Sequence, residues 1–321
     1  MIALLLRRLI HGSVTVLIAT ACAFVLIRFV GDPVATFAPQ DATQQDRDAL
    51  ARRLGLETPL PEQFGRFVVR AIRCDFGSSY RHRRPVADLI VERLPASAEL
   101  AAAAMVIAVG LGVPGGVLAA ARHGGAVARA LNGFAVLMTA MPSFVLGLVL
   151  IAIFGVALGW LPTHGRGEVI PLGFWSTGLA TSSGRAALIL PAATLAAFQL
   201  ALLLRLTRAQ TMAGLASDLV VNLRARGLGE GRVLIHHVVP LAAAPIVTLI
   251  GLQTGTLLAF SAITEQVFQW PGLGLLFLQA VTDGDIPVIA AYLCFVAALF
   301  VAVNLIVDLA CRLIDPRWLA P

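Results

Sequence analysis

Long apolar stretches alternate with short polar segments along most of this chain. A helix needs about 20 consecutive apolar residues to cross a bilayer, and six stretches meet this requirement. They cover residues 9–30, 97–121, 130–158, 186–206, 241–263 and 286–311. The pattern therefore predicts an all-α membrane protein with six transmembrane helices. Pro142 and Pro191 lie inside or near the start of two spans, where we expect kinks or unwound turns.

Composition supports this prediction. Apolar residues make up 58% of the 321 residues and charged residues only 13%, whereas about a quarter of an average soluble domain is charged. The first apolar stretch could also be a signal peptide cleaved near Cys22. It continues to Val30, however, beyond the 7–15 apolar residues typical of such a peptide. We therefore expect a retained first span.

The residue types exclude most catalytic functions. All 24 basic residues are arginine, so the chain lacks the lysine that a P-loop needs for phosphate binding and that a Schiff-base enzyme needs. The four cysteines have no metal-ligand spacing, and neither H-E-x-x-H nor G-x-S-x-G occurs. We expect no enzyme activity, cofactor or metal on this chain. If ATP drives its work, the nucleotide site must lie on another chain.

Arginine placement predicts the orientation in the membrane. If Met1 is cytoplasmic, the short segments on the same side of the membrane carry many arginines and few acids. The only arginines in the two later segments on the opposite side are Arg166 and Arg185. This is the positive-inside pattern, and it places both termini in the cytoplasm. The net charge of +6 follows from the same bias, so it does not indicate a nucleic-acid partner.

Between the first and second spans, residues 31–95 form an external segment whose apolar residues recur at helical spacing. Phe64, Phe67 and Ala71 share one face of a predicted amphipathic helix that begins at Pro61, and a second short helix is predicted from Pro85. Such helices can lie on the bilayer or on the span ends, or they can dock an external partner. The predicted parts are an N-terminal part with the first span (1–30), the external segment (31–95), a five-helix core (96–312) and a tail (313–321).

The cytoplasmic loop at 207–239 is predicted to contain a short, capped helix. Ser217 can cap its N-terminus, Asp218 adds a favourable negative charge, and Gly227 can adopt the left-handed conformation that ends a helix. The apolar face consists of Leu219, Val220 and Leu223, and the last turn carries Arg224 and Arg226. A helix this short cannot bury that face alone. It either packs under its own bundle or inserts into a groove of a partner.

This loop also carries a resemblance to a known family. Asn-Leu-Arg-Ala-Arg-Gly-Leu at 222–228, followed by Val-Leu-Ile-His-His at 233–237, resembles the loop of binding-protein-dependent ABC importer permeases. In the peptide and nickel branch of that family, the loop has the sequence pattern Y-V-R-T-A-R-A-K-G-L, followed by R-V-L-L-R-H. Gly227 matches the family's glycine, whereas Leu219 replaces the tyrosine and Arg226 replaces the lysine.

Further motifs follow in the family's order along nearly the whole chain. They include Gly31-Asp32-Pro33-Val34, Leu54-Gly55-Leu56, Asp75-Phe76-Gly77, Glu92-Arg93-Leu94-Pro95, Pro142-Ser143-Phe144, Pro271-Gly272-Leu273-Gly274 and Asp315-Pro316-Arg317. Each motif alone is weak, but their joint order is similar to the first, B-type permease of dipeptide, oligopeptide and nickel importers.

The resemblance implies a type I ABC importer permease in the cell inner membrane. A second homologous permease would complete the path for peptides or related small solutes, and an external solute-binding protein would deliver them. One or two ATPase subunits, which carry ATP and Mg²⁺, would couple to this chain through the loop at 207–239. The coupling residues that the resemblance assigns are Asp218, Leu219, Leu223, Arg224, Ala225, Arg226, Gly227 and Leu228.

Polar side chains within or at the end of spans are candidates for the path or its gate. Gln253 and Asn304 either line the path or bridge helices, and bridging is the commoner role. Glu265 closes the fifth span, where it can belong to an outer gate or to a membrane anchor. An ion-coupled secondary transporter is the alternative function, although no internal repeat or mid-membrane acid indicates that class. An intramembrane enzyme would need a reactive pair at membrane depth.

Overall fold

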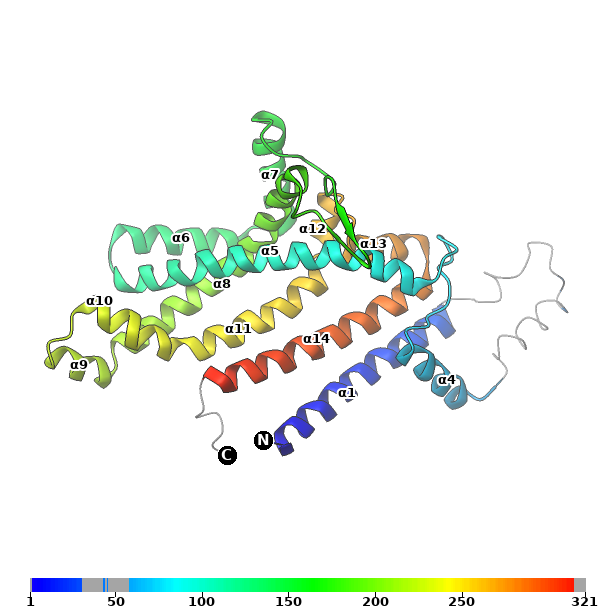
Figure 1. Ribbon diagram of the computed structural model, residues 1–321, viewed down its shortest axis with the longest axis horizontal. Helices are drawn as coiled ribbons and strands as arrows, with labels where there is room; N and C mark the ends of the chain where they lie inside the picture. The colour runs from blue at the N-terminus through cyan, green and yellow to red at the C-terminus, as the bar shows by residue number, and fades with distance from the viewer. Residues whose placement is uncertain (1, 31–42, 44, 46–57, 315–321) are drawn as a thin grey trace. The chain divides into compact units, whose positions relative to one another are not determined.

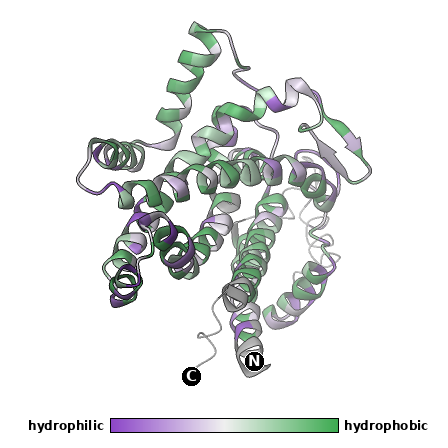
Figure 2. Ribbon diagram, turned by 60° about the vertical axis from the view of Figure 1, so that its left-hand side comes forward, coloured by the Kyte–Doolittle hydropathy of each residue, from purple (hydrophilic) through white to green (hydrophobic). Residues whose placement is uncertain are grey.

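The structure is a computed structural model that describes residues 2–30, 43, 45 and 58–314. In this part of the chain, five helices are long and apolar enough to cross a membrane, and a bent pair of helices makes a sixth. This confirms the predicted all-α membrane fold, with five spans or, if the bent pair is one span, six (Figure 1). Apolar residues run along the long helices (Figure 2). The family motifs at 31–34, 54–56 and 315–317 lie outside the described residues.

Contacts divide the chain into two compact units, and the first comprises Met1–Leu94 and Gly272–Val301. Its elements are α1 (Ile2–Val25), η1 (Leu26–Val30), α4 (Leu60–Ile72), the start of α5 (Val86–Ala121), α13 (Leu273–Asp283) and the start of α14 (Ile286–Ile314). The core of this unit joins Val86 and Leu89 of α5 to Leu276 of α13 and Val288 of α14.

The predicted amphipathic helix of the external segment is α4, and it packs on the first span. The ring centroid of Phe24 in α1 lies 5.5 Å from that of Phe64 and 5.8 Å from that of Phe67. The prediction of a separate short helix from Pro85 is wrong. Those residues are the first turns of α5, which runs through Pro95 without a break, because a long membrane helix tolerates the single hydrogen bond that a proline removes.

The second unit comprises Pro95–Pro271 and Ala302–Pro321. Its elements are the rest of α5, α6 (Ala126–Ala140), α7 (Ser143–Leu150), η2 (Ile151–Ala157), β1 (Ile170–Leu172), β2 (Trp175–Thr177), α8 (Ser182–Leu215), α9 (Asp218–Ala225), α10 (Glu230–Val233), η3 (Leu234–Val238), α11 (Val239–Phe260), α12 (Ala262–Val267) and the rest of α14. The two strands pair antiparallel, with Leu172 opposite Trp175. The division by contacts does not test the domain boundaries predicted from the sequence.

Helix α8 is the centre of the second unit. Half of its 34 residues are buried, and it contacts α6, α7 and α11. Small residues let α5 approach it closely, as is common between membrane helices. A Cβ atom on Gly116 would lie 2.6 Å from the carbonyl oxygen of Leu204 and 2.6 Å from Cβ of Thr207. At this point the α5 backbone therefore packs directly on α8.

The predicted third span is broken into two helices. Helix α6 ends at Ala140, and α7 with η2 leaves it at an angle of 108°. Met141 has extended backbone angles (φ −85°, ψ 125°), as expected for a residue that precedes a proline. The kink predicted at Pro142 is thus confirmed, whereas α8 continues through Pro191.

The contact between α5 and α8 leads to a stability prediction. We expect Gly116→Ala to destabilise the purified protein by about 1–3 kcal/mol, because the new methyl group clashes with backbone atoms of α8. Thermal unfolding in detergent measures the effect. Gly110→Ala is the matched control on the same helix, since nothing lies within 4 Å of its Cβ position. Equal melting temperatures for the two variants would contradict the close packing.

Candidate functional site

The loop between α8 and α11 contains the short helix predicted there, α9, which ends in a complete Schellman turn. Gly227 has a φ of +79°, the left-handed conformation predicted for it. Its N–H donates to the carbonyl of Arg224 at 2.9 Å, and the N–H of Leu228 donates to the carbonyl of Leu223 at 3.3 Å. These are the two hydrogen bonds of the motif, and they fix the direction in which the chain leaves α9.

One side of α9 packs on its own chain. Val220, Val233 and Val238 form a fully buried cluster, and Leu223 and Leu228 pack against it. Leu223 and Leu228 occupy the two positions whose apolar side chains commonly meet at a Schellman turn. This cluster attaches α9 to α10 and η3, which lead into α11.

The rest of the α9 surface is exposed, including the residues on either side of the buried Val220. Leu219 is 45% exposed and Val221 is 60% exposed, and the charged residues Asp218 and Arg226 are exposed beside them. The sequence left two possibilities for the apolar surface of α9: packing on its own chain or binding to a partner. Each applies to a different part of that surface. Val220 and Leu223 pack under the chain's own bundle, and Leu219 remains available to a partner.

An ion pair spans the end of α9. Arg224 donates from Nε to Oε1 of Glu230 at 2.8 Å and from Nη2 to Oε2 at 2.9 Å. The arginine lowers the pKa of the Glu230 carboxyl below its usual value of 4.5, mainly through the hydrogen bonds. The pair thus joins α9 to the first residue of α10 across the Gly227 turn, at a surface where solvent screens it.

Ser217 precedes α9 with extended backbone angles but does not cap the helix with its side chain. Its hydroxyl instead donates to the carbonyl of Gly214 at 2.6 Å. The side-chain cap predicted from the sequence is therefore wrong, because a local backbone acceptor at the end of α8 competes for the hydroxyl.

The three candidate path residues lie on different helices, and the described hydrogen bonds do not join them to one another. Gln253 of α11 donates from Nε2 to Oε1 of Gln199 on α8, so it bridges two helices. Glu265 of α12 is fully buried, and its Oε1 accepts from Ser97 at 2.7 Å and from Ser261 at 2.8 Å. Asn304 is part-buried on α14.

Sequence reasoning missed a buried ion pair near Glu265. Arg166, 8% exposed, donates from Nη2 to Glu99 Oε2 at 2.7 Å. It also donates to the backbone and the hydroxyl of Ser176 in β2, and its guanidinium lies 6.0 Å from the ring centroid of Trp270. The pair ties the hairpin to the first turns of α5 in this unit. Two features could have signalled it: an acid at the start of an apolar span and a lone arginine in a short loop.

Five or six apolar spans, with the short helix α9 in the segment between two of them, define a multi-pass membrane protein. A model for the "Binding-protein-dependent transport system inner membrane component" family matches residues 112–320, and a model for the N-terminal part of this kind of component matches residues 1–101. The chain belongs to this family, whose members are permease components of ABC transporters and not themselves catalytic. It is a multi-pass protein of the inner membrane.

Several relatives are similar over their whole length. The chain is 35% identical to the "Probable peptide ABC transporter permease protein y4tP" of Sinorhizobium fredii, covering 98% of each chain. It is 36% identical to the "Glutathione transport system permease protein GsiC" of Escherichia coli, covering 97% of each. It is 34% identical to the "Dipeptide transport system permease protein DppB" of the same species, covering 99% of this chain and 98% of the relative.

A solved structure shares the fold. A chain from the MetNI methionine ABC transporter in an inward-facing conformation superposes with a TM-score of 0.56 and 18% identity. The match covers 71% of this chain and 96% of that one.

The ion pair at the end of α9 leads to a prediction on local stability. Because the folded-state pKa of Glu230 is lowered, the pair stabilises the turn above the usual pKa of a glutamate and is lost as the pH falls through the lowered value. At neutral pH, we expect Glu230→Gln to raise amide hydrogen exchange in residues 224–232. The same substitution at Glu168, which makes no salt bridge among the described residues, is the control. Unchanged exchange in Glu230→Gln would show that the pair does not hold the turn.

Proposed function

We propose that this chain forms half of the translocation path of an ATP-driven importer of peptides or related small solutes. The names of the relatives support the substrate class, since they describe peptide, dipeptide and glutathione transport. In this proposal, α9 and the turn at Gly227 couple the spans to a separate ATPase subunit. The observation that carries it is the two-sided α9 helix, which is attached to the spans by one side and is exposed on the other.

The packing around α9 gives the coupling a physical basis. Val238 of η3 belongs to the buried cluster that holds α9, and a Cβ atom on Gly214 of α8 would lie 2.8 Å from its Cγ1. A displacement of α9 therefore moves the end of α8 and the start of α11 together. Closely packed elements transmit displacement instead of absorbing it, so movement of a partner bound to Leu219 and Val221 would reorient two spans at once.

The remaining parts of the proposal concern partners and topology. A second homologous permease completes the path, one or two ATPase subunits bind ATP and Mg²⁺, and an external solute-binding protein delivers the cargo. This chain itself binds no cofactor. With an even number of spans, both termini lie on the same side, and the arginine distribution favours the cytoplasm. The loop with α9 then faces the ATPase, and the hairpin faces the external side.

The ion-coupled secondary transporter has no support from the family to which the chain belongs. Proton or ion coupling by this chain would also call for ionisable groups along the path. The buried acids Glu99 and Glu265 are instead engaged by Arg166 and by serine hydroxyls within the protein.

Substitution of Gly227 tests the coupling role. A β-branched residue is strained at a φ of +79°, so we expect Gly227→Val to reach the membrane but to lose most ATP-dependent uptake and to copurify with less ATPase. Gly229→Val is the matched control in the same loop, because Gly229 has an ordinary φ of −69° and open space at its Cβ position. Normal uptake by Gly227→Val, or equal loss in both variants, would count against the proposed role.

A further inference from the structure

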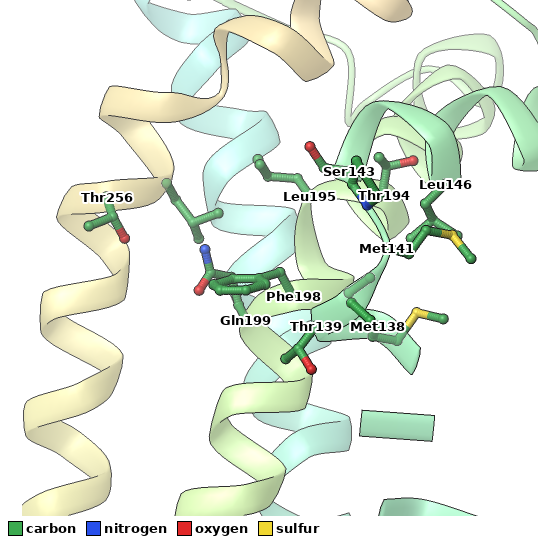
Figure 3. Close-up of a pocket in the computed structure, with 14 residues that line it drawn as sticks. Met138, Thr139, Met141, Ser143, Leu146, Thr194, Leu195, Phe198, Gln199 and Thr256 are labelled. Carbon is green, nitrogen blue, oxygen red and sulfur yellow. The ribbon is translucent and has the colours of Figure 1, made fainter. Parts of the chain in front are cut away.

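A pocket of about 370 Å³ lies at the break of the third span, where it is lined by the end of α6, the first turn of α7 and the facing parts of α8 and α11 (Figure 3). None of the 14 lining residues is charged. The C-terminal end of α6 and the N-terminal end of α7 both border the pocket, and these ends carry dipole charges of opposite sign. The pocket therefore favours neither an anion nor a cation. The exposed edge of α4, in the first unit, indicates its occupant more clearly.

Helix α4 packs on two spans inside their ends, not beyond them. The ring of Phe24 in α1, which contacts α4, lies five residues before the α1 span ends. Phe67 of α4 also packs on a cluster that includes Ala290 and Cys294 of α14, four and eight residues after that span begins. At a rise of 1.5 Å per residue, these contacts lie about 6–12 Å inside the span ends. The α1 span has 20 residues, about the length that crosses the hydrocarbon core, so the contacts lie within the bilayer.

Two apolar side chains of α4 remain exposed beside this contact. Ile72 is 78% exposed and Val69 is 51% exposed, and residues three apart are neighbours on a helix surface. Val25, next to Phe24 in α1, is also apolar and 48% exposed. Helix α4 does not run parallel to α1 (Figure 1), so it lies across the end of the span. The apolar surface of α4 therefore extends beyond the part that packs on the protein.

The opposite face of α4 is cationic. Arg66 and Arg73 are exposed, and helical periodicity places them across the helix from Phe64. Glu62 is the only acid in α4, whereas Arg66, Arg70 and, at the C-terminal cap, Arg73 are basic. An amphipathic helix with a basic polar face is typical of the membrane interface, where its apolar face is buried about 5–10 Å into the boundary between headgroups and acyl chains. This range agrees with the depth of the contacts on α1 and α14.

We propose that α4 docks on the lipid bilayer, with Ile72 and Val69 against the acyl chains and Arg66 and Arg73 at the lipid phosphates. The depth of the Phe24 contact carries this inference, because at that level the protein is surrounded by lipid and not by water. A water-soluble partner does not reach this depth. Guanidinium groups suit the other side of the helix, since their planar set of donors matches phosphate oxygens. The inference concerns how the chain sits in the membrane and does not depend on the cargo or on the ATPase.

Fluorescence quenching tests the docking in the purified complex embedded in nanodiscs. The four native cysteines are replaced by alanine, and a single cysteine is introduced by Ile72→Cys or, as the control on the cationic face, by Arg66→Cys. Each site is labelled with bimane. One quencher is a phosphatidylcholine that carries a nitroxide close to its headgroup, and the other is acrylamide, which is uncharged and dissolves in water. The ratio of the two quenching constants cancels differences in the mobility of the label.

The two sites differ in the result that lipid docking requires. We expect the ratio of lipid quenching to aqueous quenching to be several-fold higher at position 72 than at position 66. Equal ratios would overturn the proposal. Protection of position 72 from both quenchers would also overturn it, because a protein partner, such as a second permease, would then cover this edge of α4.

Amide hydrogen exchange in nanodiscs provides a second measurement, on unlabelled protein. Ile72→Gln makes the edge polar but raises the intrinsic helix propensity, whereas the control Ile72→Val keeps the edge apolar and lowers the propensity. We expect exchange in residues 60–72 to rise several-fold in Ile72→Gln, because contact with the acyl chains is lost, and to stay near the wild-type rate in Ile72→Val. Unchanged exchange in Ile72→Gln, or an equal rise in both variants, would overturn the proposal. Neither measurement requires transport, so a failure of the proposed import function leaves both results valid.

Discussion

Backbone amides and carbonyls inside a bilayer must find hydrogen-bond partners within the protein, and this constraint accounts for the architecture. It makes each long apolar stretch a helix and lets α5 continue through Pro95. It also constrains the break between α6 and α7, because the backbone amides that lose helical acceptors there need hydrogen-bond partners from a cavity, solvent or a solute. The break borders a pocket whose lining includes the first turn of α7.

The loop helix α9 depends on a different kind of stability. Eight residues cannot form a stable helix in water alone, so its order comes from the Val220 cluster, the Gly227 turn and the Arg224–Glu230 pair. These interactions hold the helix against α10 and η3 and leave Leu219 and Val221 exposed. In the proposed importer, the exposed side is the surface that the ATPase engages, and the packed side carries the movement to α8 and α11.

Sequence patterns predicted the features that local chemistry determines. Apolar length predicted the six spans, and the sequence around Gly227 predicted the left-handed turn. Features that depend on distant residues were not predictable: Pro142 indicated a break but not its angle of 108°, and Glu99 and Arg166 are 67 positions apart in the chain. Two local predictions were wrong because a competing interaction prevailed. The Ser217 hydroxyl binds the Gly214 carbonyl, and the helix predicted from Pro85 continues into the next span.

The central claim is that α9 meets the ATPase with its exposed side and the spans with its buried side. Site-directed cross-linking in the purified complex tests it most directly, with Leu219→Cys and Val220→Cys each labelled with a thiol-reactive photo-cross-linker, which needs no cysteine on the partner. Leu219 is 45% exposed, whereas its neighbour Val220 is fully buried. The account predicts a cross-link to the ATPase subunit from Leu219→Cys and none from Val220→Cys. Absence of a cross-link from Leu219→Cys in an intact complex, or the reverse pattern, would contradict it.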